Sequence, residues 1–167
     1  MSLRSLDWAI AELAARQHGV IARRQLLELG LGGRAIDYQV GAGRLHPLYR
    51  GVYSVGHPRP VGRARWMAAA LAYGPDALLS HASAAALYGL RPTARSHIDV
   101  TVPGRRGRGR PGVVLHRVRS IQDEDRAIRE RIPSPRSRAR CSTSQKYFRR
   151  GSSKRSSRRP TVCACLT

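Results

Sequence analysis

The fold is decided by residues 19–56, which read GVIARRQLLELGLGGRAIDYQVGAGRLHPLYRGVYSVG. Apolar residues at helical spacing, closed by glycines, predict one short helix over about 23–29 and a second over about 34–41. Beyond residue 43 the period changes to short extended runs broken by turn signals. The stretch therefore predicts two helices joined by a tight turn and followed by a β-hairpin.

A further helix, over about 6–18, is predicted ahead of this stretch, because apolar residues recur near 3.6-residue spacing and Gly19 is a suitable stop. Three short helices followed by a hairpin are the element order of the winged helix, a helix-turn-helix variant. In helix-turn-helix proteins the helix after the turn enters the DNA major groove, and the hairpin, or wing, lies along the phosphate backbone. We therefore expect residues 1–57 to form a winged-helix DNA-binding domain.

The predicted domain contains several polar and cationic side chains that could contact DNA. Arg and Gln suit bidentate contacts to base edges, and cations at the start of a helix reinforce the attraction of its positive end for phosphate. The side chains expected to contact DNA here are Arg23, Arg24, Arg34, Tyr38, Gln39, Arg44, His46 and Arg50. The alternative is that they form only the solvated side of a small domain, since many winged helices bind protein.

Two segments resemble a known family. Residues 15–30, ARQHGVIARRQLLELG, and residues 43–53, GRLHPLYRGVY, are similar to the N-terminal domain of AbiEi-family antitoxins of type IV toxin–antitoxin systems. That resemblance implies a winged helix that binds double-stranded DNA at its own promoter and represses its own operon. It also implies a candidate protein partner, a nucleotidyltransferase-like toxin encoded nearby.

Residues 62–131 are predicted to form a small α+β segment. Apolar patterning indicates helices over 62–73 and 77–90, then strands over 98–102 and 113–118. The acidic run at 123–125 indicates the solvated start of a further helix over 126–130. The run LSHASAAALYGL within the second helix also resembles a segment of the same antitoxin-like proteins, which favours a packing role.

The connection between the two predicted strands reads PGRRGRGRPG over residues 103–112. Arginines among glycines and prolines are typical of flexible cationic loops that bind phosphate and stack on bases. We expect Arg105, Arg106 and Arg108 to contact DNA. The alternative is a mobile hairpin tip that is basic only because Arg is the default cation of this chain.

The sequence favours a binding protein over an enzyme. Ser80-His81 offers a nucleophile beside a base, but neighbouring residues of a helix point about 100° apart, and no carboxylate is expected near it to orient the imidazole as a triad requires. His81 is therefore expected to be a capping or core residue. We expect no catalytic residue, no metal site and no cofactor. The chain contains no apolar run of membrane-spanning length, so a cytoplasmic protein is expected.

Composition changes abruptly after Ile132. All lysines and cysteines and no acidic residue lie beyond it, and residues 133–167 supply +10 of the formal net charge of +21. Back-translated with GC-rich codons and shifted by one base, residues 140–150 encode LLDLAEVLPP, which resembles the continuation of the same family. We therefore predict a frameshift near Ser134 in a truncated chain. The competing interpretation is a genuine disordered basic tail, 133–167, that binds nucleic acid.

Together these patterns predict an α+β protein in three parts, 1–57, 62–131 and the tail. The favoured function is a truncated AbiEi-like antitoxin that represses transcription by occupying DNA; its residues 1–132 carry 21 Arg against ten acidic residues, a net charge of +11. One alternative is the N-terminal DNA-positioning domain of a degenerate short-patch-repair-like endonuclease. Another is a pseudogene product without function.

Overall fold

The computed structural model describes residues 3–90, 92, 96–104 and 108–136. They form a mixed α+β fold, as predicted. The N-terminal part contains α1 (Leu3–Arg16), β1 (Val20–Ala22), α2 (Arg23–Glu28), α3 (Gly33–Gly41), β2 (Leu45–Tyr49) and β3 (Val52–Val55). The predicted helices followed by a hairpin are confirmed. The strand β1 was not predicted; it pairs antiparallel with β3, so the sheet order is β1-β3-β2.

The second part of the described chain contains α4 and two further sheets. Its elements are α4 (Arg63–Tyr73), β4 (Leu78–Leu79), α5 (His81–Leu87), β5 (Ile98–Pro103), β6 (Val113–Val118), a 3-10 turn (Asp123–Asp125), β7 (Arg126–Arg129) and β8 (Ile132–Pro135). One sheet has the order β4-β5-β6, and β7 pairs with β8 in an antiparallel hairpin. The helix predicted over 62–73 and both predicted strands are therefore present.

Two helix predictions in this part are wrong. The helix expected over 77–90 begins only at His81, because Leu78 and Leu79 form a short buried strand that pairs with β5. The helix expected over 126–130 is the strand β7, whose backbone hydrogen-bonding groups are satisfied by β8. In both places strand pairing overrides the local pattern: β4 pairs with β5, which is distant in sequence, and β7 pairs with the next strand along the chain, β8.

The β7–β8 turn explains why the sequence did not reveal this hairpin. Glu130 and Arg131 both have positive φ, 49° and 64°, in a two-residue turn of the kind that usually carries Asn-Gly. Contacts to the rest of the fold offset this unfavourable backbone conformation: Glu130 forms an ion pair with Arg63, and its carbonyl oxygen accepts a hydrogen bond from His18 Nε2 at 2.8 Å. The turn is thus held by residues from the N-terminal part and from α4.

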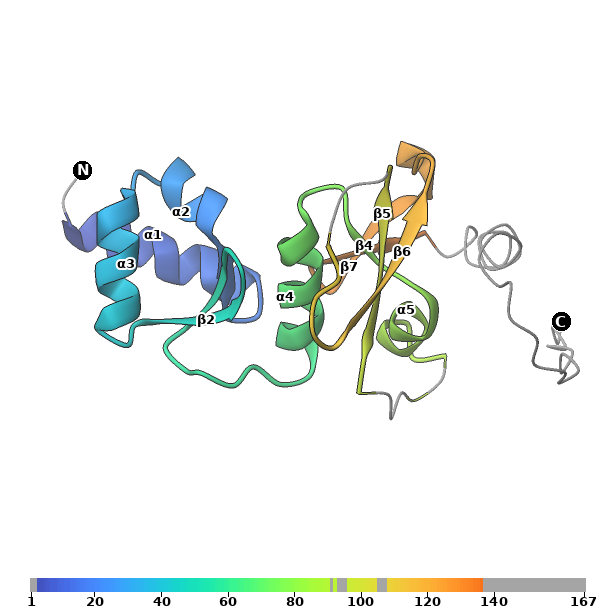
Figure 1. Cartoon of the computed structure of the whole chain (residues 1–167), viewed down its shortest axis with the longest axis horizontal. Helices are drawn as coiled ribbons and strands as arrows, with labels where there is room; N and C mark the ends of the chain where they lie inside the picture. The colour runs from blue at the N-terminus through green and yellow to red at the C-terminus, as the bar shows by residue number, and fades with distance from the viewer. Residues whose placement is uncertain (1–2, 91, 93–95, 105–107, 137–167) are drawn as a thin grey trace, which may run out of the picture.

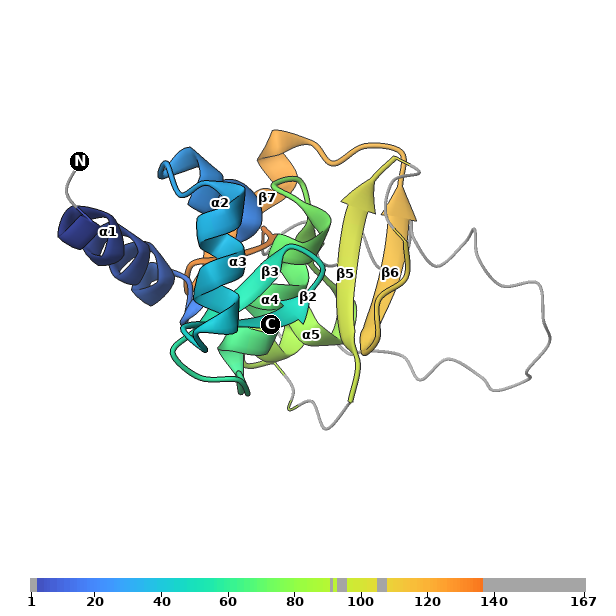
Figure 2. The same cartoon turned by 60° about the vertical axis from the view of Figure 1, so that its left-hand side comes forward.

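The connection between β5 and β6 is not a hairpin tip. The two strands are parallel, with Ile98 opposite Val113, and Figure 2 shows them side by side and pointing the same way. The connection must therefore run back along the whole length of the pair. Arg110 anchors its returning end, because its Nη2 donates to the carbonyl oxygen of Ala72 at 2.7 Å and its guanidinium lies 5.3 Å from the centre of the Tyr73 ring.

The ordered fold extends slightly past the predicted start of the tail. Pro133 to Pro135 belong to β8, where Ile132 and Ser134 are fully buried. The side chain of Ile132 packs in the main core. Residues 137–167, which contain the remainder of the predicted tail, lie outside the described residues.

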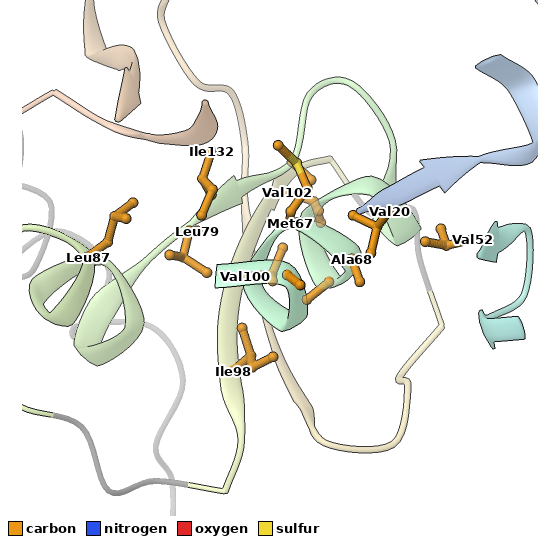
Figure 3. Packing of buried hydrophobic residues seen from close by; sticks show 13 residues of the cluster. Val20, Val52, Met67, Ala68, Leu79, Leu87, Ile98, Val100, Val102 and Ile132 are labelled. Carbon is orange, nitrogen blue, oxygen red and sulfur yellow. The ribbon is translucent and has the colours of Figure 1, made fainter. Parts of the chain in front are cut away.

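The helix α4 lies between the two parts of the molecule (Figure 1) and contacts all three sheets. Its buried side chains are small, apart from Met67. On one side they meet Val20 and Val52 of the N-terminal sheet, and on the other they meet a group around Leu79 and Ile132 (Figure 3). The buried residues of the main core are Val20, Val52, Ala64, Met67, Ala68, Ala69, Ala77, Leu79, Leu87, Ile98, Val100, Val102 and Ile132.

We predict that enlarging a small side chain of α4 destabilises the protein. Ala68 is 1% exposed, so Ala68→Leu places three extra carbon atoms in a filled core and should lower the free energy of unfolding by about 1–3 kcal/mol. Ala15→Leu, the same change at an exposed position of α1, is the matched control and should shift it by less than about 0.5 kcal/mol. Denaturant unfolding measures both. Equal stabilities for the two variants would contradict this packing.

Candidate nucleic-acid interface

The helix α3 presents a polar face to solvent. It follows two glycines, and its buried residue Ile36 packs with Leu26 and Leu31 in a second core beneath α1 and α2. Arg34 and Tyr38, one helical turn apart, are exposed, and Tyr38 reaches 71% exposure. A large aromatic ring with so little contact to its own chain is available for a partner.

Gln39 does not share that face. It is half-buried and, together with Arg44 and Asp7, lines a shallow groove against α1. Among the predicted DNA-contacting residues, Arg34 and Tyr38 are therefore brought together on α3. Gln39 and Arg44 lie beside α1 instead.

The β2–β3 hairpin places its cation at the turn. Arg50 is exposed there, and Gly51 has φ of +77°, a conformation that glycine adopts without the strain a Cβ atom would bring. His46, in the middle of β2, is half-buried. The hairpin tip therefore carries Arg50 as its accessible cation, with His46 set further back.

Arg23 and Arg24 are engaged within the fold. Arg23 Nη1 donates to Asp37 Oδ1 and to the hydroxyl of Tyr53, both at 3.2 Å, and these hydrogen bonds raise the pKa of the guanidinium. Arg24 Nη1 donates to the carbonyl oxygen of Leu71 in α4, also at 3.2 Å. These contacts tie α2 to α3, to the hairpin and to α4.

The connection between β5 and β6 lies beside the hairpin. A groove is lined by Asp37 of α3, by Tyr49 and Arg50 of the hairpin region, and by Gly109 and Arg110 of the connection. Arg108, which directly precedes Gly109, is exposed, whereas Arg105 and Arg106 lie outside the described residues. The fold therefore gathers α3, the hairpin tip and part of the Arg-Gly connection around one groove.

The N-terminal part of the chain, from within α1 to the end of β3, matches a known protein family. Residues 9–56 match the family of AbiEi antitoxin transcriptional regulators. The matched residues, hereafter the AbiEi segment, begin within α1 and end directly after β3. No curated protein matches the chain. Within the described part of the chain, no helix has the length and apolar character needed to cross a bilayer.

A second group of polar side chains lies outside the AbiEi segment and was not predicted. Asp99 of β5 is almost fully buried, and its Oδ1 lies 2.9 Å from Nε2 of His116 on β6. The His116 ring stacks on that of His81, with centroids 3.8 Å apart and an angle of 23° between the ring planes. The sequence argument that no carboxylate lies near His81 is therefore wrong in three dimensions, because β5 brings Asp99 to this site.

The sequence held a partial signal for this group. Asp99 lies opposite Val114 in the parallel pair, and His116 follows Val114 by two residues. Because alternate residues of a strand lie on the same face of the sheet, Asp99 and His116 share a face. The parallel register that brings them together was not evident from the sequence.

His81 has φ of +46°, an uncommon conformation for a residue other than glycine.

The arrangement is not a Ser-His-Asp triad. Ser80 Oγ lies 3.1 Å from Nδ1 of His81, but the carboxylate of Asp99 contacts the other imidazole. A triad needs a single imidazole between the hydroxyl and the carboxylate. Burial raises the pKa of Asp99, but the hydrogen bond with His116 and the neighbouring imidazoles lower it by more, so the net shift is downward and the carboxylate is charged at neutral pH.

His18, two residues after the end of α1, contacts the β7–β8 turn. Its Nε2 donates to the carbonyl oxygen of Glu130. Burial lowers the pKa of His18 below its ordinary value of 6.5, and the positive charges of Arg63 and Arg131 lower it further. In the unfolded chain the imidazole regains its ordinary pKa, so acidification protonates the unfolded state more readily than the folded one. The stability that this residue contributes is present above pH 6.5 and is lost as the pH falls toward the lowered pKa.

We predict that His18→Gln reduces the pH dependence of stability. The amide nitrogen of Gln still donates to a carbonyl oxygen but does not titrate, so the fall in melting temperature from pH 7.5 to pH 5.5 should be smaller than in the unmodified protein. His57→Gln, at an exposed position, is the matched control and should leave that fall unchanged. Thermal unfolding followed by circular dichroism measures it. The same pH dependence in His18→Gln and the unmodified chain would show the assignment to be wrong.

Proposed function

We propose that this protein is a DNA-binding transcriptional repressor that acts as the antitoxin of a type IV toxin–antitoxin system. The observation that carries the proposal is the match of the AbiEi segment to a family of antitoxin transcriptional regulators. The same segment has three helices followed by a hairpin, the element order of a winged helix, and its α3 and hairpin tip present exposed Arg and Tyr side chains.

In this proposal α3 is the recognition helix and enters the major groove of the operator. Arg34 and Tyr38, which share the exposed face of α3, are the side chains that would contact base edges. Arg forms bidentate hydrogen bonds with guanine O6 and N7. Ile36, on the opposite side of α3, fixes the helix to its core, so the polar face is presented on a rigid element.

Phosphate contacts would come from the hairpin and from the second part of the molecule. Arg50 lies at the hairpin tip, and the exposed Arg108 directly precedes Gly109, which lines the groove that the hairpin shares with the β5–β6 connection. Such contacts position a protein on the duplex without reading its sequence. The net charge of +11 over residues 1–132 provides the long-range attraction that speeds association.

Repression would follow from occupancy alone, without catalysis. A protein bound across its own promoter excludes the transcription machinery, and this mechanism requires no cofactor. The proposed protein partner is a nucleotidyltransferase-like toxin encoded nearby, whose expression the repressor would control together with its own.

We expect Arg34→Ala to weaken binding to DNA from upstream of the gene by about 1–3 kcal/mol and to relax the preference for that DNA. Arg50→Ala should weaken binding to every duplex and reduce the slope of log affinity against log salt concentration by about 0.9, the value for one lost phosphate contact. Fluorescence anisotropy titrations at several salt concentrations separate the two effects.

The matched control for this titration is Arg119→Ala, which removes an exposed arginine directly after β6 and therefore changes the net charge by the same amount. It should leave the sequence preference intact. If Arg34→Ala and Arg50→Ala bound with the affinity and salt slope of the unmodified protein, the proposed recognition surface would be wrong.

A further inference from the structure

The cluster of His81, Asp99 and His116 is not used by the proposed DNA-binding function. It lies in the second part of the molecule, on α5, β5 and β6. One ligand-capable atom of each residue lies within 4.8 Å of the other two. We propose that these three side chains form a binding site for one divalent transition-metal ion of the Zn²⁺ type.

The donor set selects this class of ion. Two imidazole nitrogens with one carboxylate oxygen suit Zn²⁺ and neighbouring transition metals, whereas Mg²⁺ and Ca²⁺ prefer oxygen ligands alone. Three protein ligands around Zn²⁺ leave a fourth tetrahedral position open for water or another small ligand. Because His81 is exposed, that position would lie on the solvent side of the cluster.

The spacing of the two inner donors already suits a shared ion. Ligands about 2.0–2.2 Å from a tetrahedral Zn²⁺ ion lie roughly 3.3 Å from one another, and Asp99 Oδ1 lies 2.9 Å from His116 Nε2. In the metal-free protein these two atoms share a proton. The ion would take the place of that proton at Nε2, and the neutral ring would keep its one proton on Nδ1.

The second carboxylate oxygen of Asp99 gives independent support for a bound cation. Its side chain is 5% exposed, and among the described residues its Oδ2 is buried without a hydrogen-bond partner. A buried carboxylate oxygen without a partner is unfavourable, and a cation beside the carboxylate would compensate it. The backbone of Asp99 is held firmly, since its N–H donates to Ser83 Oγ and its carbonyl oxygen accepts from the N–H of Ser80, both at 2.9 Å.

His81 must turn for the ion to bind. Nearly parallel stacked rings direct their in-plane lone pairs in parallel, so His81 and His116 do not converge on one point in the stacked arrangement. His81 is the exposed member of the pair, and rotation about its side-chain bonds would bring one ring nitrogen toward Asp99 Oδ1. The ion would then link α5 to both β5 and β6.

The test is a zinc titration of the full chain, produced without a polyhistidine tag. Cys141, Cys163 and Cys165 are replaced by Ser in every protein used, because thiolates also bind Zn²⁺. Isothermal titration calorimetry with zinc chloride should give one ion per chain. Co²⁺ should give the visible absorption of a tetrahedral site, and Mg²⁺ should not compete.

Two variants locate the site and one serves as control. His81→Ala removes an exposed ligand, and Asp99→Asn keeps the shape of the carboxylate but removes its charge. Each should weaken zinc binding by at least about tenfold, because loss of a residue that only supports a metal ligand already weakens metal affinity by about that factor. His57→Ala, at an exposed position in the N-terminal part, should bind zinc as the parent does. Circular dichroism checks the fold, and His81→Ala decides the matter if Asp99→Asn unfolds.

Zinc uptake that is absent in the parent, or unchanged in His81→Ala, would overturn the proposal. These titrations contain no DNA. A failure here therefore leaves the proposed repressor function untouched, and a failure of DNA binding leaves the metal site untouched.

Discussion

The small side chains of α4 are the constraint on which the rest of the structure depends. This helix contacts all three sheets, and with Ala64, Ala68 and Ala69 buried in the main core the sheets approach it closely from two sides. Protein interiors are packed as densely as organic crystals, so a larger side chain here would have to displace one of its neighbours. The relative placement of the two parts of the molecule therefore follows from α4.

That placement has a consequence for the proposed DNA surface. Because α4 brings the second part against the N-terminal sheet, the β5–β6 connection returns beside the hairpin, where Arg110 is held by Ala72 and Tyr73 at the end of the same helix. Polar contacts from Arg24 to Leu71 and from His18 to Glu130 reinforce the junction. Cations from two distant segments thus lie around one groove, although the AbiEi segment alone supplies α3 and the hairpin.

Most helices of the N-terminal part could be predicted from the sequence. The strand β1 and the β7–β8 hairpin could not, because neither carries the usual local pattern of a strand or a turn. Glycines that end helices, together with apolar residues at helical spacing, located α1, α2 and α3 to within a few residues. The strand β1 has only three residues and no alternation, since all three are buried. The β7–β8 turn has the sequence Glu130-Arg131, whereas two-residue hairpin turns are usually recognised by Asn-Gly.

The candidate sites divide in the same way. Arg34, Tyr38 and Arg50 could be selected because helix and hairpin periodicity indicates which residues face outward. The internal contacts of Arg23 and Arg24 could not, because Asp37, Tyr53 and Leu71 are brought to them only by the tertiary fold. The cluster at Asp99 depends on a parallel strand register, which local sequence does not encode.

The central claim, that α3 lies in the major groove of the protein's own promoter, is tested most directly by photocrosslinking from position 38. A photoreactive phenylalanine analogue in place of Tyr38 keeps an aromatic side chain at a position that is 71% exposed, and the same analogue in place of Trp8, 67% exposed on α1, is the control. Our account predicts crosslinks from position 38 to defined bases upstream of the gene and none from position 8. Crosslinks from position 8 alone, or from neither position under conditions where DNA is bound, would contradict it.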